Sequence, residues 1–378
     1  MKIKNISLFE AIATLVGTII GAGILGVPYV FSHSGFWTGT FALILVGSAM
    51  LVMKLLFGEA TLRTPGIHQL SGYAEIYLGK IFKYLMSFSL ILGIYGSLLA
   101  YTIGQGEVIS ALTGLSSDLS SLLFYFVGSI LVFFGLNLVK KVELWLTAAI
   151  IFVIIIIGVI SAPSIKLANI TGFDISSLFM PYGVILFACS GIVAVAEIRQ
   201  ELAHRKKLMK PAILIGASVP VLIYFLFAVF AVGVSGTEVT PIATLGLGYA
   251  LGWKALLAIN IFAFFAISTS FLTLSLALKQ VYQFDYKIKP VLSWLLAMSI
   301  PIIIFLAGAR DFIQVLGIVG ALSVGFTGIM NVLIYFSARK KGTLEPEYKI
   351  PLWLGNISGG VIIIIFVFGL IYAVSEFV

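Results

Sequence analysis

The chain is 378 residues long, 61% of them hydrophobic and 10% charged, with a mean hydropathy of +1.16. A soluble domain is nearer half apolar and a quarter charged, so this composition excludes a soluble globular protein and predicts a polytopic membrane protein. The formal net charge is +8, but no soluble module with base-reading or stacking residues accompanies it, so we expect no nucleic-acid partner.

Eleven apolar segments are long enough to cross a bilayer as helices. In chain order they are 8–31, 37–57, 82–106, 119–139, 144–161, 178–198, 211–234, 253–282, 291–308, 312–337 and 352–374. The amino-terminal stretch lacks the small-residue cleavage pattern of a signal peptide. We expect a single all-α transmembrane domain, residues 1–378, surrounded by bilayer lipid.

Lys and Arg lie mostly on one side of these spans. With a cytoplasmic amino terminus, the outer segments hold only Lys166, Lys254 and Arg310. The cytoplasmic segments hold the other twenty: Lys2, Lys4, Lys54, Arg63, Lys80, Lys83, Lys140, Lys141, Arg199, Arg205, Lys206, Lys207, Lys210, Lys279, Lys287, Lys289, Arg339, Lys340, Lys341 and Lys349. This positive-inside bias predicts a multi-pass protein of the cell membrane with its amino terminus in the cytoplasm and its carboxyl terminus outside.

The first span carries four glycines and a proline between Gly17 and Pro28. Glycine and proline weaken a helix, and an unpaired peptide group in hydrocarbon costs several kcal/mol unless it lies within protein or beside a cavity. We therefore predict a helix broken near mid-membrane, which indicates a binding site. The Gly17-to-Gly21 spacing taken alone also fits a helix-packing motif.

The sixth span has a similar cluster of small residues, from Cys189 to Gly191. Gly23 and Gly191 are 168 positions apart, and five spans separate them, so the two halves of the chain would have opposite orientations. Paired broken helices in such inverted repeats form a site near the midplane. We expect one repeat over about 8–161, a second over about 178–337, and an extra helix at 352–374. The alternative for the sixth span is close helix packing.

The sequence provides little for metal or disulfide chemistry. Cys189 is the single cysteine, which excludes an internal disulfide and a cysteine-based metal site. His33, His68 and His204 lie on three different segments, so we expect them to be solvated. We expect no bound cofactor.

Three segments resemble a known family. The run from Ile20 to Tyr29 resembles the first-helix motif of the amino acid/auxin permease family and of the related bacterial aromatic amino-acid permeases. Ala266 to Leu272 resembles their Thr-Ser-Phe-Leu segment, and Leu99 to Gly104 is a looser match. The resemblance implies a LeuT-type fold of five plus five inverted helices, with helices 1 and 6 discontinuous and one additional carboxyl-terminal helix. It also implies a secondary active amino-acid transporter.

An amino acid brings a carboxylate and an ammonium into the membrane, and a broken helix can bind both. The amides of Ala22 and Gly23, at the start of a half-helix, are predicted to bind the carboxylate, and Gly21 and Gly23 allow close approach to the backbone. Carbonyls in the sixth span are predicted to bind the ammonium. The predicted substrate residues are Gly21, Ala22, Gly23, Tyr101, Phe187, Ala188, Cys189, Ser190 and Gly191. Tyr101 and Cys189 retain an alternative as ordinary buried side chains.

The same resemblance implies a sodium site. Its ligands are the carbonyls of Gly17, Ile20 and Ala266 and the hydroxyls of Thr269 and Ser270, whereas a divalent metal would normally require carboxylates. Adjacent Thr and Ser hydroxyls can instead hydrogen-bond to their own helix. Some related permeases are proton-driven through a lysine on the fifth helix. Here that span has no ionisable residue, although Glu10, Glu107 or Glu197 could carry a proton.

These patterns predict a sodium-coupled permease for a neutral, bulky or aromatic amino acid, because no charged side chain belongs to either break. A proton-coupled permease and a non-transporting amino-acid sensor on the same fold are the alternatives. A membrane enzyme would require converging catalytic groups, and a channel a charged ring or repeated filter sequence. Neither is found, so we expect a transporter that is not an enzyme.

Overall fold

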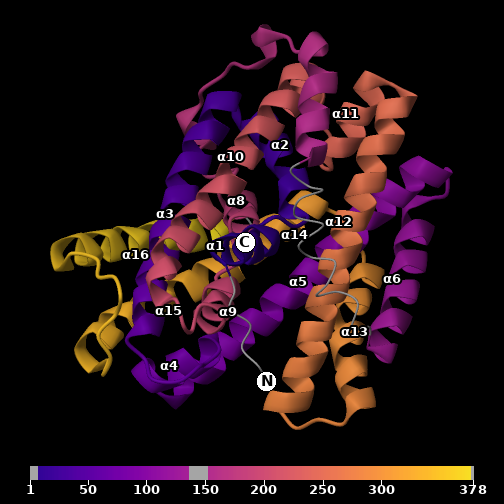
Figure 1. The fold of residues 1–378 in the computed structure, drawn as a ribbon. Coiled ribbons are helices and arrows are strands. Elements are labelled where there is room, and N and C mark those ends of the chain that lie inside the picture. The colour runs from indigo at the N-terminus through magenta and orange to yellow at the C-terminus, as the bar shows by residue number, and fades with distance from the viewer. Residues whose placement is uncertain (1–6, 136–151, 376–378) are drawn as a thin grey trace.

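The structure is a computed structural model, and it describes residues 7–135 and 152–375. Every regular element in that part of the chain is helical (Figure 1). Among these described residues, eight helices are long and apolar enough to cross a membrane, or nine when one bent pair is counted as a span. Two shorter apolar helices, Phe152–Ser164 and Pro290–Leu306, lie at two further predicted spans. An all-helical, multi-span fold is therefore confirmed, whereas a count of eleven is not established.

The α-helices of the first half are α1 (Leu8–Ile19), α2 (Gly23–Ser34), α3 (Phe36–Leu62), α4 (Leu70–Leu78), α5 (Lys80–Thr113) and α6 (Ser117–Phe134). Those of the second half are α8 (Tyr182–Ala188), α9 (Val193–Glu201), α10 (Met209–Ser235), α11 (Ala243–Leu251), α12 (Trp253–Gln280), α13 (Pro290–Leu306), α14 (Phe312–Ile318), α15 (Gly325–Lys341) and α16 (Leu352–Ser375). Residues 136–151, which include the first eight positions of the predicted fifth span, lie outside the described residues.

The predicted break in the first span is present. Helix α1 ends at Ile19, α2 begins at Gly23, and the two are bent by 58°. The start of α1 is well defined, because Ser7 and Glu10 form a reciprocal capping box. The sixth predicted span is also interrupted. Helix α8 ends at Ala188, α9 begins at Val193, and Gly191 between them has a φ of +93°, a conformation that glycine adopts most readily.

Two short helices that the sequence analysis did not predict occupy matching places in the two halves. Helix α4 has nine residues, ends at Gly79 with a φ of +106°, and leads directly into α5. Helix α11 also has nine residues, ends at Gly252 with a φ of +92°, and leads directly into α12. Each short helix thus follows a long span (α3 or α10) and precedes another. The halves therefore share an internal order of elements.

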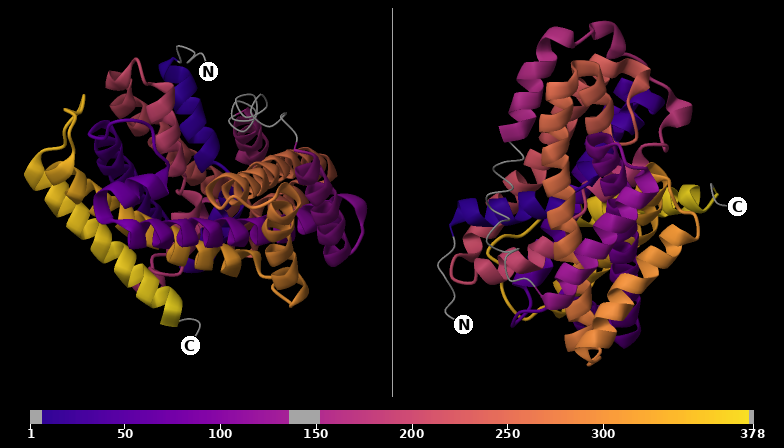
Figure 2. Two further views of the ribbon diagram at one scale, coloured as in Figure 1. Left: turned by 90° about the horizontal axis from the view of Figure 1, so that it is seen from below. Right: turned by 90° about the vertical axis from the view of Figure 1, so that its right-hand side faces the viewer.

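The helices form two groups around the breaks. Helices α1, α2, α3, α9 and α10 pack mainly on one another, as do α5, α6, α12 and α13. Helix α8 packs on α2 and α3 and also on residues 312–324. In Figure 1, α1 and α8 lie between α3 on one side and α12 on the other, and Figure 2 shows α16 along the outside of the molecule. Large apolar side chains such as Phe126 and Phe368 are exposed on the outer helices, as expected of surfaces that face lipid. Both breaks are therefore in the protein interior.

One predicted feature of the helices was wrong. The second span was expected to end at residue 57, with Lys54 among the cytoplasmic charges, but α3 continues to Leu62 and Lys54 is 1% exposed. The tenth predicted span is present and contains a π-helical turn, Val319–Val324, between α14 and α15. At this turn α8 crosses so closely that a Cβ on Gly320 would clash with the backbone of Gly183, and such turns are frequent at functional sites.

A fully buried carboxylate fastens one end of the bundle. Glu59 of α3 accepts hydrogen bonds from Arg63 at 2.8 and 3.0 Å, and from Arg339 of α15 at 2.9 and 3.2 Å. It also accepts the backbone amide of Ile350 at 2.7 Å. Tyr348, in the same loop, donates to the carbonyl of Leu55 at 2.7 Å. The loop between α15 and α16 is thereby attached to the end of α3.

We predict that Glu59→Gln destabilises the protein strongly. The substitution leaves the guanidinium groups of Arg63 and Arg339, whose side chains are 12% and 15% exposed, without their buried counter-charge. Breaking a buried ion pair in this way costs about 3–5 kcal/mol. Thermal unfolding of the purified protein in detergent measures the loss. Glu75→Gln is the matched control, because Glu75 pairs with Lys83 at a half-exposed site where such pairs contribute about 0–1 kcal/mol. Equal losses in the two variants would contradict a structural role for the Glu59 cluster.

Candidate functional site

The two breaks contact each other through their glycines. A Cβ atom on Gly23 would lie 2.7 Å from the Cα of Ala188, so the first residue of α2 packs directly on the last residue of α8. In the reciprocal contact, a Cβ on Gly191 would lie 2.7 Å from a side-chain carbon of Ile19, the last residue of α1. Neither contact leaves room for a side chain. The predicted substrate residues Gly23, Ala188 and Gly191 are thus brought together.

The start of α2 offers unpaired hydrogen-bond donors. Within the described part of the chain, the amides of Ala22 and Gly23 donate to no protein acceptor, while the amide of Gly21 donates to the carbonyl of Ile19 at 3.1 Å. Ala22 and Gly23 are buried, and helix starts carry a partial positive charge. This geometry suits an anionic group of a ligand, such as a carboxylate.

A tyrosine that the sequence analysis did not single out connects the two breaks. The hydroxyl oxygen of Tyr224, on α10, lies 2.9 Å from the carbonyl oxygen of Ile19 and 2.9 Å from that of Ala188. The side chain is fully buried. These carbonyls belong to the last residues of α1 and α8, where helical partners are missing. Tyr224 therefore satisfies carbonyls that the breaks leave without helical partners.

A lysine provides a second connection. The Nζ atom of Lys54 donates to the carbonyl oxygen of Cys189 at 2.7 Å, and both residues are buried. Cys189 is the C-cap residue that directly follows the last residue of α8. The sequence analysis predicted that a substrate ammonium would face the carbonyls of Phe187, Ala188 and Ser190. In this structure the ammonium of Lys54 already donates to the carbonyl of Cys189, and the hydroxyl of Tyr224 donates to that of Ala188.

Residues from the other group of helices meet the first break at Gly21. A Cβ on Gly21 would lie 3.4 Å from the hydroxyl of Tyr101, on α5, and 3.5 Å from the hydroxyl of Ser270, on α12. Tyr101 was predicted to face the substrate and Ser270 to face sodium. The structure thus places Gly21 at the boundary between the two helix groups, with a hydroxyl from each of two helices beside it.

The predicted sodium ligands of α12 form one small cluster. The carbonyl of Ala266 accepts from Thr269 at 3.1 Å and from Ser270 at 3.0 Å, and Thr269 also approaches the carbonyl of Phe265 at 2.9 Å. Both hydroxyls therefore bond back to their own helix, as the alternative interpretation stated. On the α1 side, Ile20 is buried and Gly17 half-buried. Within the described residues, no group of three His, Cys, Asp or Glu side chains is placed to hold a metal ion.

The glutamates proposed as proton carriers lie away from this cluster of contacts. Glu10 caps the start of α1 through Ser7. Glu107 is exposed and accepts a hydrogen bond from Ser117 at 2.6 Å. Glu197 is exposed on α9. The charged side chain that does reach a break is Lys54. The sequence analysis assigned Lys54 to the cytoplasmic charges because it lies three residues before the predicted end of the second span. The helix continues for five residues beyond that end, so Lys54 lies inside the bundle.

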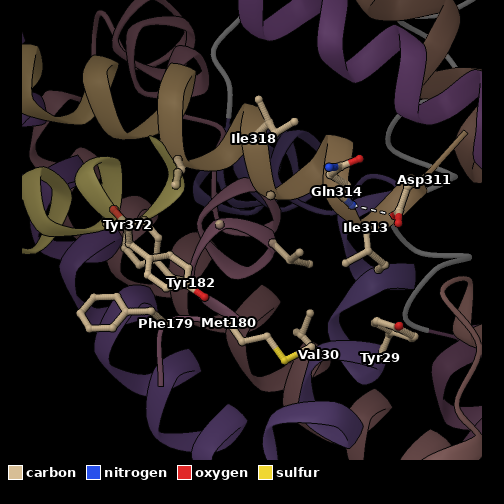
Figure 3. Close-up of a pocket in the computed structure, with 16 residues that line it drawn as sticks. Tyr29, Val30, Phe179, Met180, Tyr182, Asp311, Ile313, Gln314, Ile318 and Tyr372 are labelled. Carbon is tan, nitrogen blue, oxygen red and sulfur yellow. Dashed lines mark hydrogen bonds between the residues drawn. The ribbon is translucent and has the colours of Figure 1, made fainter. Parts of the chain in front are cut away.

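A cavity of about 440 Å³ is lined by residues of α2, α8, α14 and α16 (Figure 3). Tyr182, Phe179 and Tyr372 cluster at one end of it, and Asp311, Gln314 and Tyr29 line the other. Asp311 accepts the amide of Gln314 at 2.8 Å and so caps α14. None of the predicted substrate or sodium residues lines this cavity. The predicted site is instead closely packed in this structure.

Comparison with known proteins agrees with this architecture. The sequence profile of the tryptophan/tyrosine permease family matches residues 4–375. A glutamine transporter 2 of Aliivibrio fischeri is 22% identical, over 98% of this chain and 100% of its own length. A tyrosine-specific transport system 1 of Haemophilus influenzae is 24% identical, over 94% of this chain and 92% of its own length. A low affinity tryptophan permease of Escherichia coli is 22% identical, over 96% of this chain and 94% of its own length. The relatives are transporters, which confirms the prediction that the chain is not an enzyme.

Solved structures show the same fold. The crystal structure of MhsT in complex with L-phenylalanine superposes with a TM-score of 0.71 at 12% identity, covering 97% of this chain and 98% of MhsT. The inward facing conformation of Mhp1 gives a TM-score of 0.66 at 15% identity, covering 97% and 88%. These likenesses confirm the LeuT-type fold that the sequence resemblance implied.

We predict that Gly23→Ala disrupts the contact between the breaks. The added methyl group would lie 2.7 Å from the Cα of Ala188, a backbone atom, so the helices must separate, and overpacking of this kind costs about 1–3 kcal/mol. Thermal unfolding should show the loss. Gly360→Ala is the control, because nothing lies within 4 Å of a Cβ there. A Gly23→Ala protein as stable as the control would show that the breaks are not closely packed.

Proposed function

The chain belongs to the tryptophan/tyrosine permease family, and on that basis we propose that it is a secondary active permease for a neutral amino acid. The observation that carries the proposal is the meeting of the two breaks, with the free amides of Ala22 and Gly23 at their contact. A carboxylate is the anionic group that every amino acid presents to such donors. The substrate ammonium would approach the carbonyls of Phe187 and Ser190, because Tyr224 and Lys54 already bind those of Ala188 and Cys189.

Two observations support a neutral and bulky substrate. The described residues of the two breaks include no acidic or basic side chain, so a charged substrate side chain would have no counter-charge supplied by them. The relatives named above transport glutamine, tyrosine or tryptophan by their names, and all three are neutral. We propose a zwitterion with a large uncharged side chain, moved across the cell membrane with the amino terminus of the protein in the cytoplasm.

We propose sodium as a coupling ion. The ligands would be the carbonyls of Gly17, Ile20 and Ala266 and the hydroxyls of Thr269 and Ser270. The short distance between the Ser270 hydroxyl and Gly21, two residues after the end of α1, supports this assignment. Five oxygens without a carboxylate suit a weakly held monovalent cation. On binding sodium, both hydroxyls would keep donating to their own helix and turn a lone pair toward the ion.

The experiment is uptake of a panel of radiolabelled amino acids into proteoliposomes, with and without an inward sodium gradient. We expect accumulation of neutral amino acids that rises when sodium is present outside. Ser270→Ala should abolish the stimulation or raise the sodium concentration that it requires by about tenfold, equivalent to losing one ligand of about 1.4 kcal/mol.

Ser358→Ala is the matched control for that variant. Ser358 also donates to the carbonyl four residues earlier, at 2.7 Å, but on the exposed face of α16. Accumulation of amino acid that does not depend on sodium would refute the sodium assignment but would still agree with the proposed permease function. Amino-acid binding without uptake, detected as thermal stabilisation of the purified protein, would instead favour a sensor.

A further inference from the structure

The cavity in Figure 3 shares no residue with the proposed substrate site. Its lining residues belong to α2, to residues 179–184, to residues 311–321 and to α16. Helices α5 and α12, which carry Tyr101 and Ser270 beside the first break, contribute none of the described lining residues. Its volume of about 440 Å³ is within the range of about 300–1,000 Å³ that small-molecule pockets cover. The cavity is therefore large enough for a ligand other than the substrate.

One end of the cavity can be reached from solution. Asp311 and Gln314, at the start of α14, are exposed and line this end together with Tyr29 of α2 (Figure 3). Tyr29 lies near the end of α2, which leads into the start of α3, whereas Glu59 lies near the other end of α3. The exposed end of the cavity is therefore at the opposite end of the bundle from the Glu59 cluster, and it faces outward in the proposed orientation.

The exposed end offers a binding site for a cation. Asp311 is the one residue with a charged side chain in the described lining of the cavity, and no Lys, Arg or His accompanies it there. One carboxylate oxygen of Asp311 accepts the amide of Gln314 at 2.8 Å, and the described residues supply no partner for the other. The ring of Tyr29 lies at the same end (Figure 3), and aromatic rings attract cations to their faces. An ammonium is thus the kind of charged group that this end favours.

The other end of the cavity is aromatic. Phe179 and Tyr372 stack there with their ring centroids 5.4 Å apart, and Tyr182 lies beside them (Figure 3). Tyr182 is 4% exposed, and its hydroxyl is buried without a hydrogen-bond partner among the described residues. A buried polar group without a partner is costly. A planar aromatic ring that carries an N–H or O–H group could pack against this cluster and satisfy the hydroxyl.

We propose that the cavity is a second small-molecule site, which binds a cationic amine with an aromatic body. The ammonium binds Asp311, and the aromatic body packs against Phe179 and Tyr182. An amino acid fits this site less well, because its carboxylate would find no cation in the described lining.

A ligand in this site would contact both α2 and α14, because both helices line the cavity. It would hold the two helices together and so slow any step of transport in which α2 moves relative to α14. The binding of the amine is independent of the proposed function, whereas its effect on uptake rests on that function.

The test measures binding of radiolabelled tryptamine to the purified protein in lipid nanodiscs. We expect saturable binding that excess glutamine, tyrosine and tryptophan do not displace. Indole, which lacks the amine, should compete about fivefold more weakly than unlabelled tryptamine, the fold-change expected for one exposed charge pair. In proteoliposomes, tryptamine should lower the maximal rate of amino-acid uptake and leave its KM unchanged.

Two variants test the two requirements of the site, a carboxylate and an open cavity. Asp311→Asn removes the charge and keeps a residue that caps helices well, so the affinity for tryptamine should fall about fivefold. Gly317→Leu should abolish binding by filling the cavity, because Gly317 lines it and a Cβ there would meet no atom within 4 Å. Gly360→Leu is the matched control, since a Cβ on Gly360 also meets nothing within 4 Å but Gly360 does not line the cavity. Thermal unfolding checks that each variant is folded.

Four outcomes would overturn the proposal. The first is the absence of saturable tryptamine binding to the wild type, a result that needs no variant to fold. The second is an unchanged affinity in Asp311→Asn, and the third is binding that persists in Gly317→Leu. The fourth is displacement of tryptamine by the amino acids, which would place the amine at the breaks. Absence of amino-acid uptake under any gradient would instead refute the proposed transport function, while tryptamine binding would still support the second site.

Discussion

The structure depends on satisfying the backbone groups that two interrupted helices leave unpaired in an apolar interior. A carbonyl or amide without a partner costs several kcal/mol in hydrocarbon, and each break releases several of them. Tyr224 and Lys54 bind carbonyls at the ends of α1 and α8, while the amides of Ala22 and Gly23 at the start of α2 have no acceptor in the described part of the chain. Protein donors thus bind the carbonyl ends of α1 and α8, which carry partial negative charge. The start of α2, which carries partial positive charge, has no protein acceptor among the described residues.

This constraint also organises the packing of the helices. Lys54 and Tyr224 come from α3 and α10, which belong to the same helix group as the breaks that they hold. Tyr101 and Ser270 come from the other group and lie beside Gly21. Within the first group, Lys54 and Tyr224 form hydrogen bonds to the breaks. At Gly21, the hydroxyls of Tyr101 and Ser270 lie at van der Waals distance from an ideal Cβ position across the boundary. Relative movement of the two groups would therefore disturb few of the bonds that preserve the breaks.

Much of this architecture could be predicted from the sequence, because the break in a membrane helix has a local cause. Glycines and Pro28 within an apolar run were sufficient to locate the first break, and the spacing to Gly191 located the second. Tyr224 could not be predicted, since a tyrosine in an apolar helix has no pattern that identifies its partner. Lys54 was misplaced because the end of α3 was set five residues too early. The π turn at Val319–Val324 depends on the close crossing of α8, a tertiary contact.

Tyr224 has one hydroxyl hydrogen and two carbonyl acceptors at the same distance. The hydrogen can serve either acceptor or be shared between them, so the two breaks compete for a single donor on equal terms. The carbonyl ends of α1 and α8 are thus coupled through one hydroxyl group, and a change in the position of either end would change how much of the hydrogen bond the other receives.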